Sequence, residues 1–404
     1  MNKKIFKSIG PGFILASLVL GPGSITVASR IGSASSFSLL WVVLIAGVSM
    51  IIYTSMAARI GIVSPNTLLK TITDTYGKWF AVSIGVASFL ASLSWQFGNN
   101  LGAGIAMSEI TGINEAIWPL IFTPIALVLL FYAKNLYKSL EKIMMYMVMI
   151  MIIAFLFTLV LIQPNLLEVT KGFLPLSFST SNFDEIAALV ATTFALPAAV
   201  YQAYLVRDKG WKKDKLEEGQ ISAGMGVIML GLITTMIIIT SAATLYPKGI
   251  VVNSAADMAK QLEILFGSYA KYVFSIGLSA AAFSSLMVNA VIGGGLLSDS
   301  LNLGRSMNDK MPKLFTTIIL VVGMLIAAFF KGNIIYALIM AQASSVFGVP
   351  LIAVGIFLLA NNKKVMGEFV NNKWQNGIAI FGFILISSMV YFMISKLFLF
   401  IGKV

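Results

Sequence analysis

Long apolar segments separated by short polar stretches follow one another along almost the whole chain. A segment of about 20 apolar residues is long enough to cross the hydrocarbon core of a bilayer as a helix. The pattern predicts an all-α polytopic membrane protein, with a single transmembrane domain over residues 1–404. Its eleven transmembrane helices are expected at residues 11–31, 38–58, 79–107, 116–133, 143–162, 184–206, 221–245, 270–297, 314–330, 334–360 and 377–400.

The first predicted helix is interrupted near its middle by Gly21, Pro22, Gly23 and Ser24. Proline has no backbone N–H and glycine is a poor helix former, so the helix is expected to break there. Broken backbone at membrane depth persists only where it is buried in protein or lines a wet cavity. A solute site is one explanation, and a proline kink stabilised by neighbouring helices is the other.

The sixth predicted helix carries a second interruption near its middle. Its residues are Leu196, Pro197, Ala198 and Ala199. If residues 10–162 form one five-helix repeat and residues 184–360 a second, each interruption lies in the first helix of its repeat. Paired interruptions of this kind point to a transporter built from inverted repeats. Residues 377–400 then form one additional helix.

Composition supports a membrane protein, because 58% of the residues are hydrophobic and only 11% are charged. The net charge of +12 lies mainly in the loops on one side of the predicted topology. The positive-inside rule puts that side and the N-terminus in the cytoplasm, and eleven helices put the C-terminus outside. A bacterial plasma membrane is the expected location. Charge placed in this way calls for no nucleic-acid partner, and no cofactor or obligatory protein partner is evident.

Three amide side chains lie close together in the third predicted helix. Gln96, Asn99 and Asn100 are spaced i, i+3 and i+4, which places them on one helix face. Amides at membrane depth are costly unless they are paired. They therefore line a cavity or bridge neighbouring helices, and the sequence leaves both options open. The tenth helix adds another amide, Gln342.

These features predict a binding site for a small solute or an ion. Its expected residues are Gly21, Pro22, Gly23, Ser24, Leu196, Pro197, Ala198 and Ala199, with Gln342, Gln96 and Asn99 as lining. The free N–H groups that follow the break in the first helix form the positive end of a half-helix, which favours a carboxylate or another anionic group. An enzyme is disfavoured, because the sequence shows no nucleophile–base pair, phosphate loop or metal-ligand cluster.

Several motifs resemble the NRAMP family of proton-coupled divalent-metal transporters. Gly10-Pro11-Gly12-Phe13 followed by Gly21-Pro22-Gly23-Ser24 is similar to the family's opening Gly-Pro-Gly and Asp-Pro-Gly-Asn. Gln342, Pro350 and the stretch Met366-Gly367-Glu368-Phe369 are similar to its tenth-helix pattern. The likeness covers nearly the whole chain. It implies a LeuT-like fold of two inverted five-helix repeats plus one helix, with alternating access around a midplane site.

The chain departs from the family where the family binds its metal. The Asp and Asn of the family motif correspond to Gly21 and Ser24, and its Met-Pro-His corresponds to Leu196-Pro197-Ala198. An acidic pair on the third helix is replaced by Gln96 and Asn99, and the chain has no His. Divalent ions are held by carboxylates or, for transition metals, by softer ligands. The substitutions argue against transition-metal transport and proton coupling.

Three hypotheses follow from the sequence. The first is a carrier on the family scaffold for a cation, held by carbonyl groups, Ser24, Gln96, Asn99 and Gln342. The second is a carrier of a small carboxylate-bearing solute such as an amino acid, for which the small residues Ala198 and Ala199 leave space. The third is a sensor or receptor that keeps the fold without transport, although no additional signalling domain is present.

Restoring only the first-helix residues of the family motif tests the importance of the missing ligands. The double substitution Gly21→Asp and Ser24→Asn is expected not to create robust Mn²⁺ transport, because the soft ligand of the sixth helix would still be absent. Uptake of Mn²⁺ into proteoliposomes measures this. Robust Mn²⁺ uptake by the double variant would contradict the expectation.

Overall fold

The computed structural model describes residues 20–132, 134–175, 183–306 and 309–401, and this part of the chain contains helices and no strands. The helices of the first half are α2 (Pro22–Ser35), α3 (Leu40–Val63), α4 (Leu68–Tyr76), α5 (Lys78–Thr111), α6 (Ile117–Phe131), α7 (Lys134–Ile162) and α8 (Leu166–Gly172). Those of the second half are α9 (Phe183–Thr193), α10 (Leu196–Asp208), α11 (Leu216–Thr244), α12 (Ala255–Ala259), α13 (Glu263–Phe266), α14 (Ala270–Ser300), α15 (Lys310–Phe329), α16 (Ile334–Ser344), α17 (Val349–Ala360), α18 (Lys363–Met366) and α19 (Lys373–Ile401). Short 3₁₀ turns, among them η6 (Ser345–Gly348), connect some of them.

The helices confirm an all-α membrane protein. In the described part of the chain, nine helical segments are long and apolar enough to cross a membrane, and α6 is a shorter apolar helix. Predicted helices two to eleven each correspond to one of these segments. Of the first predicted helix, only the part from residue 20 onward is described, and it forms α2. The opening motif at residues 10–13 lies outside the described residues.

Both predicted interruptions mark the start of a helix. Helix α2 begins at Pro22, with Gly21 in an extended conformation before it. The sixth predicted helix is divided into α9 and α10 by the non-helical residues Phe194 and Ala195, and Pro197 lies in the first turn of α10. Proline suits the first turn because its missing N–H would have no partner there.

The tenth predicted helix is also irregular, which its sequence pattern did not indicate. Between α16 and α17 the backbone tightens into the 3₁₀ turn η6, and Pro350 follows in the first turn of α17. Two hydroxyl groups satisfy the carbonyls at the end of α16. Ser94 of α5 donates to the Ala341 carbonyl at 2.6 Å, and Ser345 donates to the Gln342 carbonyl at 2.7 Å.

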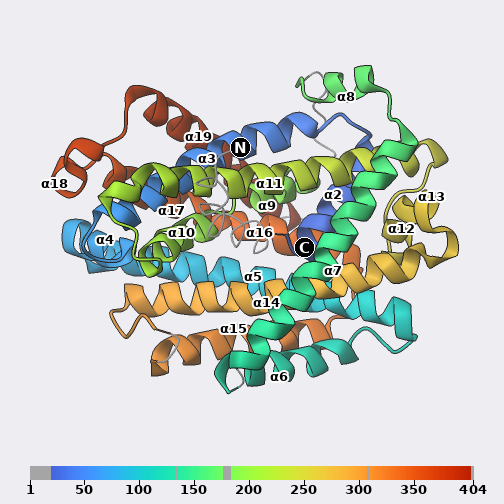
Figure 1. Cartoon of the computed structure of the whole chain (residues 1–404), viewed down its shortest axis with the longest axis horizontal. Coiled ribbons are helices and arrows are strands. Elements are labelled where there is room, and N and C mark those ends of the chain that lie inside the picture. Colours follow the sequence, from blue (N-terminus) through green and yellow to red (C-terminus); the bar gives the residue numbers. More distant parts are fainter. Residues whose placement is uncertain (1–19, 133, 176–182, 307–308, 402–404) are drawn as a thin grey trace.

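The long helices form two packed groups. In one group, α11 packs against α2 and α3, and α10 packs against α3; in the other, α14 packs along α5, and α15 packs against α14, α5 and α6. Figure 1 shows the first group in its upper half and the second below it, with α16 between them. Helix α16 contacts α9, α2 and α5, so it joins the two groups at the level of the breaks.

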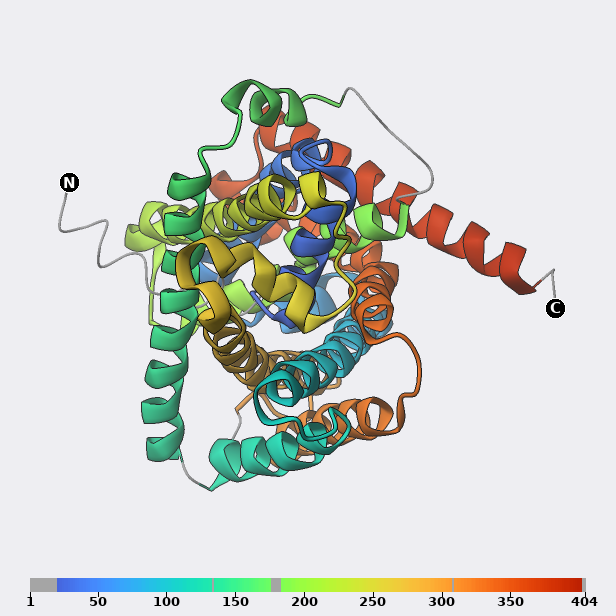
Figure 2. The ribbon, with the colours of Figure 1, turned by 90° about the vertical axis from the view of Figure 1, so that its right-hand side faces the viewer.

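Helices α7 and α19 lie at the periphery. Only 22% of the apolar stretch of α7 and 28% of that of α19 is buried within the protein. Figure 2 shows α7 along one side of the molecule and the end of α19 projecting beyond the opposite side. Apolar helices with so little burial are suited to contact with lipid.

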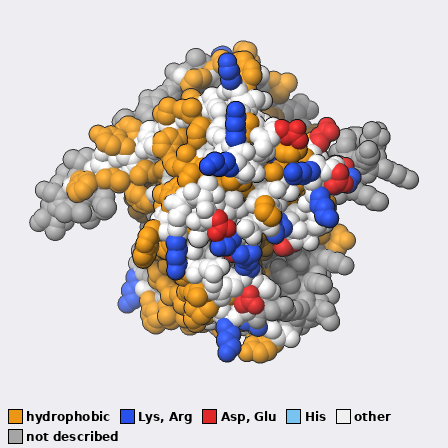
Figure 3. All heavy atoms as spheres, turned by 90° about the vertical axis from the view of Figure 1, so that its left-hand side faces the viewer, with side chains coloured by type: hydrophobic (Ala, Val, Ile, Leu, Met, Phe, Trp, Pro, Cys, Tyr) orange, Lys and Arg blue, Asp and Glu red, His pale blue; other side chains and the backbone are white. Residues whose placement is uncertain are grey.

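One end of the molecule carries many charged side chains. Figure 3 shows Lys and Arg side chains on the end where Figure 1 labels α4, α10 and α18. This end is called the α4 end below. The sequence predicts that it faces the cytoplasm, and the orientation of the protein in the membrane stays a prediction.

A close contact fixes the first turn of α2 against α5. A Cβ atom added to Gly102 would lie 2.1 Å from the Cβ atom of Pro22, whereas a Cβ added to Gly47 of α3 would meet nothing within 4 Å. The absence of a side chain at residue 102 therefore allows α2 to start where it does.

The variant Gly102→Ala is expected to unfold at a lower temperature than the unmodified protein, because overpacking of this kind costs about 1–3 kcal/mol. Gly47→Ala is the matched control, and its higher helix propensity should leave stability unchanged or slightly raised. Thermal unfolding of the detergent-purified proteins measures both. Equal melting temperatures for the two variants would contradict the contact.

Candidate functional site

A small buried cavity lies where the two broken helices meet. It is lined by Gly21, Ser24, Trp95, Asn99, Thr192, Ala195, Asn289 and Gln342, which come from α2, α5, α9, α14, α16 and the residues flanking the breaks. Its water-accessible volume is about 20 Å³, which is room for a single water molecule. Each lining residue is buried. The site therefore lies inside the protein in this conformation rather than at its surface.

Ser24 closes the break at the start of α2. Its hydroxyl group accepts a hydrogen bond from the Gly21 N–H at 3.1 Å and donates to the Gly21 carbonyl at 2.9 Å. The same carbonyl accepts the first helical hydrogen bond, from the Ile25 N–H at 3.2 Å. Ser24 thus satisfies backbone groups that the break exposes and also presents its oxygen to the cavity.

Helix α5 contributes Trp95 and Asn99 to the cavity. The Asn99 Oδ1 atom would lie 3.1 Å from a Cβ added to Gly21, so the amide packs directly against the break. In the described part of the chain, the Asn99 Nδ2 atom has no hydrogen-bond partner although the residue is only 2% exposed. A buried N–H donor without a partner is costly, and a ligand or water that accepts a hydrogen bond would satisfy it.

Gln342 reaches the cavity from the last turn of α16, next to the irregular turn η6. Its Nε2 atom would lie 2.0 Å from a Cβ added to Gly23 and 3.4 Å from one added to Gly98. The side chain therefore lies across the first turn of α2, in a position that only a glycine at residue 23 permits.

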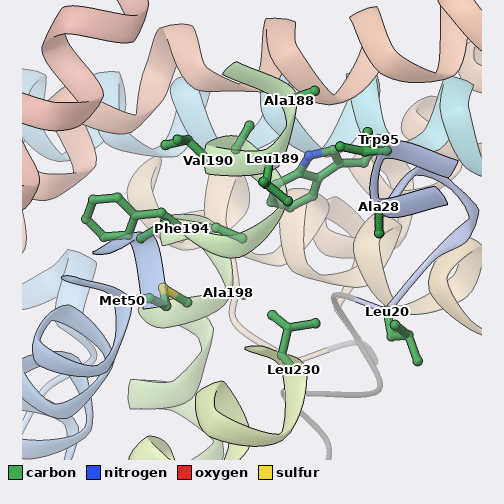
Figure 4. Packing of buried hydrophobic residues seen from close by; sticks show 14 of the residues in the cluster. Leu20, Ala28, Met50, Trp95, Ala188, Leu189, Val190, Phe194, Ala198 and Leu230 are labelled. Carbon is green, nitrogen blue, oxygen red and sulfur yellow. The ribbon is translucent and has the colours of Figure 1, made fainter. Parts of the chain in front are cut away.

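The sixth predicted helix lines the cavity with residues that precede its restart. Thr192 and Ala195 face the cavity, whereas Leu196 and Ala198 are buried in the apolar core. The sixth predicted helix therefore lines the cavity with Thr192 and Ala195, which precede the restart, and not with residues 196–199 as expected. The Phe194 ring of the break lies 5.4 Å, centroid to centroid, from the Tyr53 ring of α3 and anchors the break in the apolar core, where Figure 4 shows it.

Pro22, Gly23, Pro197 and Ala199 are likewise not among the lining residues, although all four are buried. Their contribution is to the backbone. The two prolines start the half-helices, and Gly23 leaves space for Gln342.

Sequence reasoning missed Asn289 of α14. This amide lines the cavity from α14, a helix that otherwise stands out for its small residues and contacts Gly21 one turn earlier through Ser285. Its signal in the sequence is weak but present, because it is a lone amide in the middle of an apolar segment.

Gln96 and Asn100 do not reach the cavity. The Gln96 side chain packs against Gly323 of α15, where a Cβ atom would lie 2.6 Å from its Cγ. The Asn100 amide donates to the Gln96 carbonyl at 2.9 Å and accepts from Thr123 of α6 at 3.2 Å. The amides of α5 therefore have different neighbours. Asn99 lies against α2, whereas Gln96 and Asn100 contact α15 and α6.

The cavity offers neutral oxygen and nitrogen atoms only. No acidic or basic side chain lines it, and no group of three or more His, Cys, Asp or Glu side chains suited to a metal occurs among the residues that the structure describes. Hydroxyl and amide oxygens suit hard cations, whereas amide N–H groups suit a carboxylate. Because an amide carries both, the side chains alone permit either ligand.

The sequence is similar to bacterial proteins named divalent metal cation transporter MntH. It is 25% identical to the protein from Listeria welshimeri, over 98% of this chain and 92% of that protein. It is 23% identical to the protein from Bacillus subtilis, over 96% of this chain and 91% of that one. These relatives are named as transporters rather than enzymes, in agreement with the expectation from the sequence.

Solved structures of low sequence identity share the fold. A manganese transporter of Eremococcus coleocola superposes with a TM-score of 0.77 at 15% identity, over 97% of this chain and 87% of that one. MhsT, solved in complex with L-phenylalanine, superposes with a TM-score of 0.62 at 16% identity, over 94% of this chain and 98% of that one. The second is a LeuT-fold transporter, so the predicted LeuT-like fold is confirmed.

The family profile described as natural resistance-associated macrophage protein-like matches residues 12–396, which is nearly the whole chain. With this match, the similar bacterial transporters and the shared fold, the chain is an integral membrane transporter that belongs to the Nramp family.

Proposed function

We propose that the protein is a secondary-active carrier of a hard divalent cation such as Mg²⁺, working by alternating access around the cavity between α2, α9 and α16. The observation that carries the proposal is the buried cavity between the start of α2 and the end of α9, because its polar lining consists of neutral side chains that carry oxygen atoms. The carrier function is supported by the family, and the cation class by relatives that are named for divalent metals. The oxygen atoms that line the cavity then favour hard cations over transition metals.

The cavity combines five neutral side chains with oxygen atoms. They are Ser24, Asn99, Thr192, Asn289 and Gln342. Hard cations accept oxygen ligands from amides, hydroxyls and carbonyls, and transition-metal selectivity needs sulfur or imidazole groups. None of the cavity residues supplies such a group. The α9 end of the break adds the partial negative charge of a helix C-terminus, which favours a cation.

The size of the cavity supports a small ion. A volume of about 20 Å³ accommodates one water molecule or a cation of similar size, and it is too small for an amino acid in this conformation. Mg²⁺ usually keeps several waters in proteins, so the neutral oxygens of the cavity would replace only part of its hydration shell. Waters retained by the ion would be accommodated in the more open conformations of the cycle.

Alternating access requires two parts that move relative to each other, and the two packed groups provide them. Each group takes helices from residues 10–162 and from residues 184–360, as two inverted five-helix repeats would. We therefore propose these repeats as the internal division of the domain, with α19 as the additional helix.

A carrier of a small carboxylate-bearing solute is the second candidate, favoured by the Asn99 Nδ2 donor, which has no partner among the described residues, and by the helix starts at the cavity. The starts of α2 and α10 both lie at the cavity, where Gly21 and Ala195 line it, and helix N-termini attract anions. Thermal stabilisation by an amino acid, with none by divalent ions, would favour this candidate. A ligand at about 100 times its dissociation constant stabilises a protein by roughly 2.7 kcal/mol, which such a measurement detects.

Two glutamines provide a matched pair of variants. Gln342→Met is expected to weaken Mg²⁺ binding about tenfold or more, because an oxygen ligand to a charged group contributes on the order of 1.5–3 kcal/mol and a thioether is a poor ligand for a hard cation. Gln96→Met removes an equally buried amide that does not reach the cavity, so binding should remain near that of the unmodified protein.

Isothermal titration with Mg²⁺ measures binding, and uptake of Mg²⁺ into proteoliposomes measures transport. Mn²⁺ is titrated in parallel and is expected to bind no more tightly than Mg²⁺. An equal loss of Mg²⁺ affinity in the Gln342→Met and Gln96→Met variants would contradict the proposed cation site. Much tighter binding of Mn²⁺ than of Mg²⁺ would also contradict it.

The neutral lining also predicts how transport depends on pH. Because no titratable side chain lines the cavity, Mg²⁺ uptake is expected to change less than about twofold between about pH 6 and pH 8 and to move no protons. A pH-sensitive dye inside the proteoliposomes reports proton movement during uptake. Acidification that accompanies Mg²⁺ entry and stops in the absence of Mg²⁺ would disprove the prediction.

A further inference from the structure

A second cavity lies at the α4 end, beside a buried carboxylate that the cation site does not use. Its water-accessible volume is about 350 Å³, and its lining residues include Thr67, Tyr204 and Arg305. The carboxylate is that of Asp299, in the last turn of α14, and its side chain is only 1% exposed. This cavity is called the vestibule below.

Asp299 connects three helices that the sequence places far apart. Its Oδ2 atom accepts a hydrogen bond from Thr67, the N-cap residue of α4, at 2.6 Å and from Tyr204 of α10 at 2.5 Å. Its Oδ1 atom is paired with the Arg305 guanidinium at 3.0 Å. A buried carboxylate needs such partners, since an unpaired charge would be strongly unfavourable.

The same two helices form walls of both cavities. Helix α14 lines the central cavity with Asn289 and carries Asp299 ten residues further on, which is about 15 Å along a helix. Helix α10 starts beside Ala195, which lines the central cavity, and presents Tyr204 to the vestibule. On α14 the vestibule begins close to the central cavity, because Val291 and Ile292 line it two and three residues after Asn289.

A further contact of α10 lies at the same level. Arg207 donates to the Ser64 carbonyl at 3.2 Å and to the Pro65 carbonyl, both in the connection between α3 and α4. The end of α10 is thus held to the α4 region from two sides. Separation of α10 from α4 and α14 would open the vestibule toward the central cavity.

We propose that Asp299 holds a gate at the α4 end, and that release of its bonds to Thr67 and Tyr204 opens the path from the vestibule to the cation site. The Arg305 partner is suited to an exchangeable role, because its side chain is 42% exposed and lies in the connection that follows α14. The inference deepens the proposed function by naming a residue that controls access to the site.

Cysteine labelling tests the gate without any substrate. The chain has no native cysteine, so Thr192→Cys places one thiol in the central cavity. A charged, membrane-impermeant thiol reagent is added to one side of sealed vesicles, in buffer free of divalent ions. Reference proteins with Lys364→Cys or Lys171→Cys show which side carries the α4 end and which the opposite end, because these residues lie on α18 and α8.

In the Thr192→Cys background, Asp299→Ala is expected to raise the labelling rate at least tenfold from the α4 end and to leave the rate from the opposite end unchanged. Tyr204→Phe removes one of the bonds and is expected to give a smaller rise on the same side. Asp208→Ala is the matched control, because this acid also lines the vestibule but is exposed and makes no bond to α4 or α14. Its labelling rate should stay within about twofold of the background.

Unchanged labelling in both Asp299→Ala and Tyr204→Phe would overturn the gate, as would an equal rise from both ends or an equal rise in Asp208→Ala. If Asp299→Ala fails to give a folded, monodisperse protein, Asp299→Asn and Tyr204→Phe decide the question by the same criteria. Because labelling involves no cation, failure of the gate leaves the cation proposal untouched. Failure of Mg²⁺ binding would equally leave the labelling result intact.

Discussion

Backbone groups without hydrogen-bond partners in the middle of a bilayer are the constraint on which this structure depends. Lipid offers no partner, so each break in a transmembrane helix must be satisfied by the protein itself. The start of α2 meets this need with the Ser24 hydroxyl, which bonds both backbone groups of Gly21. The end of α16 meets it with Ser94 and Ser345. The breaks are consequently places where polar atoms gather, and the candidate site is built from them.

Close packing around glycine determines where the site's side chains lie. Gly102 lets the first turn of α2 approach α5, and this approach places Gly21 against Asn99. Gly23 lets Gln342 cross the same turn. Two of the three amides that line the cavity, Asn99 and Gln342, thus owe their positions to glycines at helix contacts. The positions of the polar atoms in the site therefore depend on how closely α2 packs against its neighbours.

The sequence allowed the breaks before α2 and between α9 and α10 to be predicted, because proline has a local physical effect at the position it occupies, whereas the turn η6 was not predicted. It could not separate Asn99 from Gln96, since both lie on one face of α5 and only tertiary packing decides which meets α2 and which meets α15. Thr192 escaped notice because it precedes the proline that signals the break. Asp299 lies two residues beyond the predicted helix 270–297, and only its tertiary contacts with α4 and α10 bury it.

The neutral lining of the cavity has an electrical consequence. Because no charged side chain lines the cavity, the empty carrier moves no charge when it changes from one open side to the other. The carrier loaded with a divalent ion moves two elementary charges. Each elementary charge that crosses a potential of 100 mV changes the free energy by about 2.3 kcal/mol. For a divalent cargo this amounts to about 4.6 kcal/mol, or more than three decades of concentration ratio. The membrane voltage alone would then drive accumulation on the negative side, without a coupling ion.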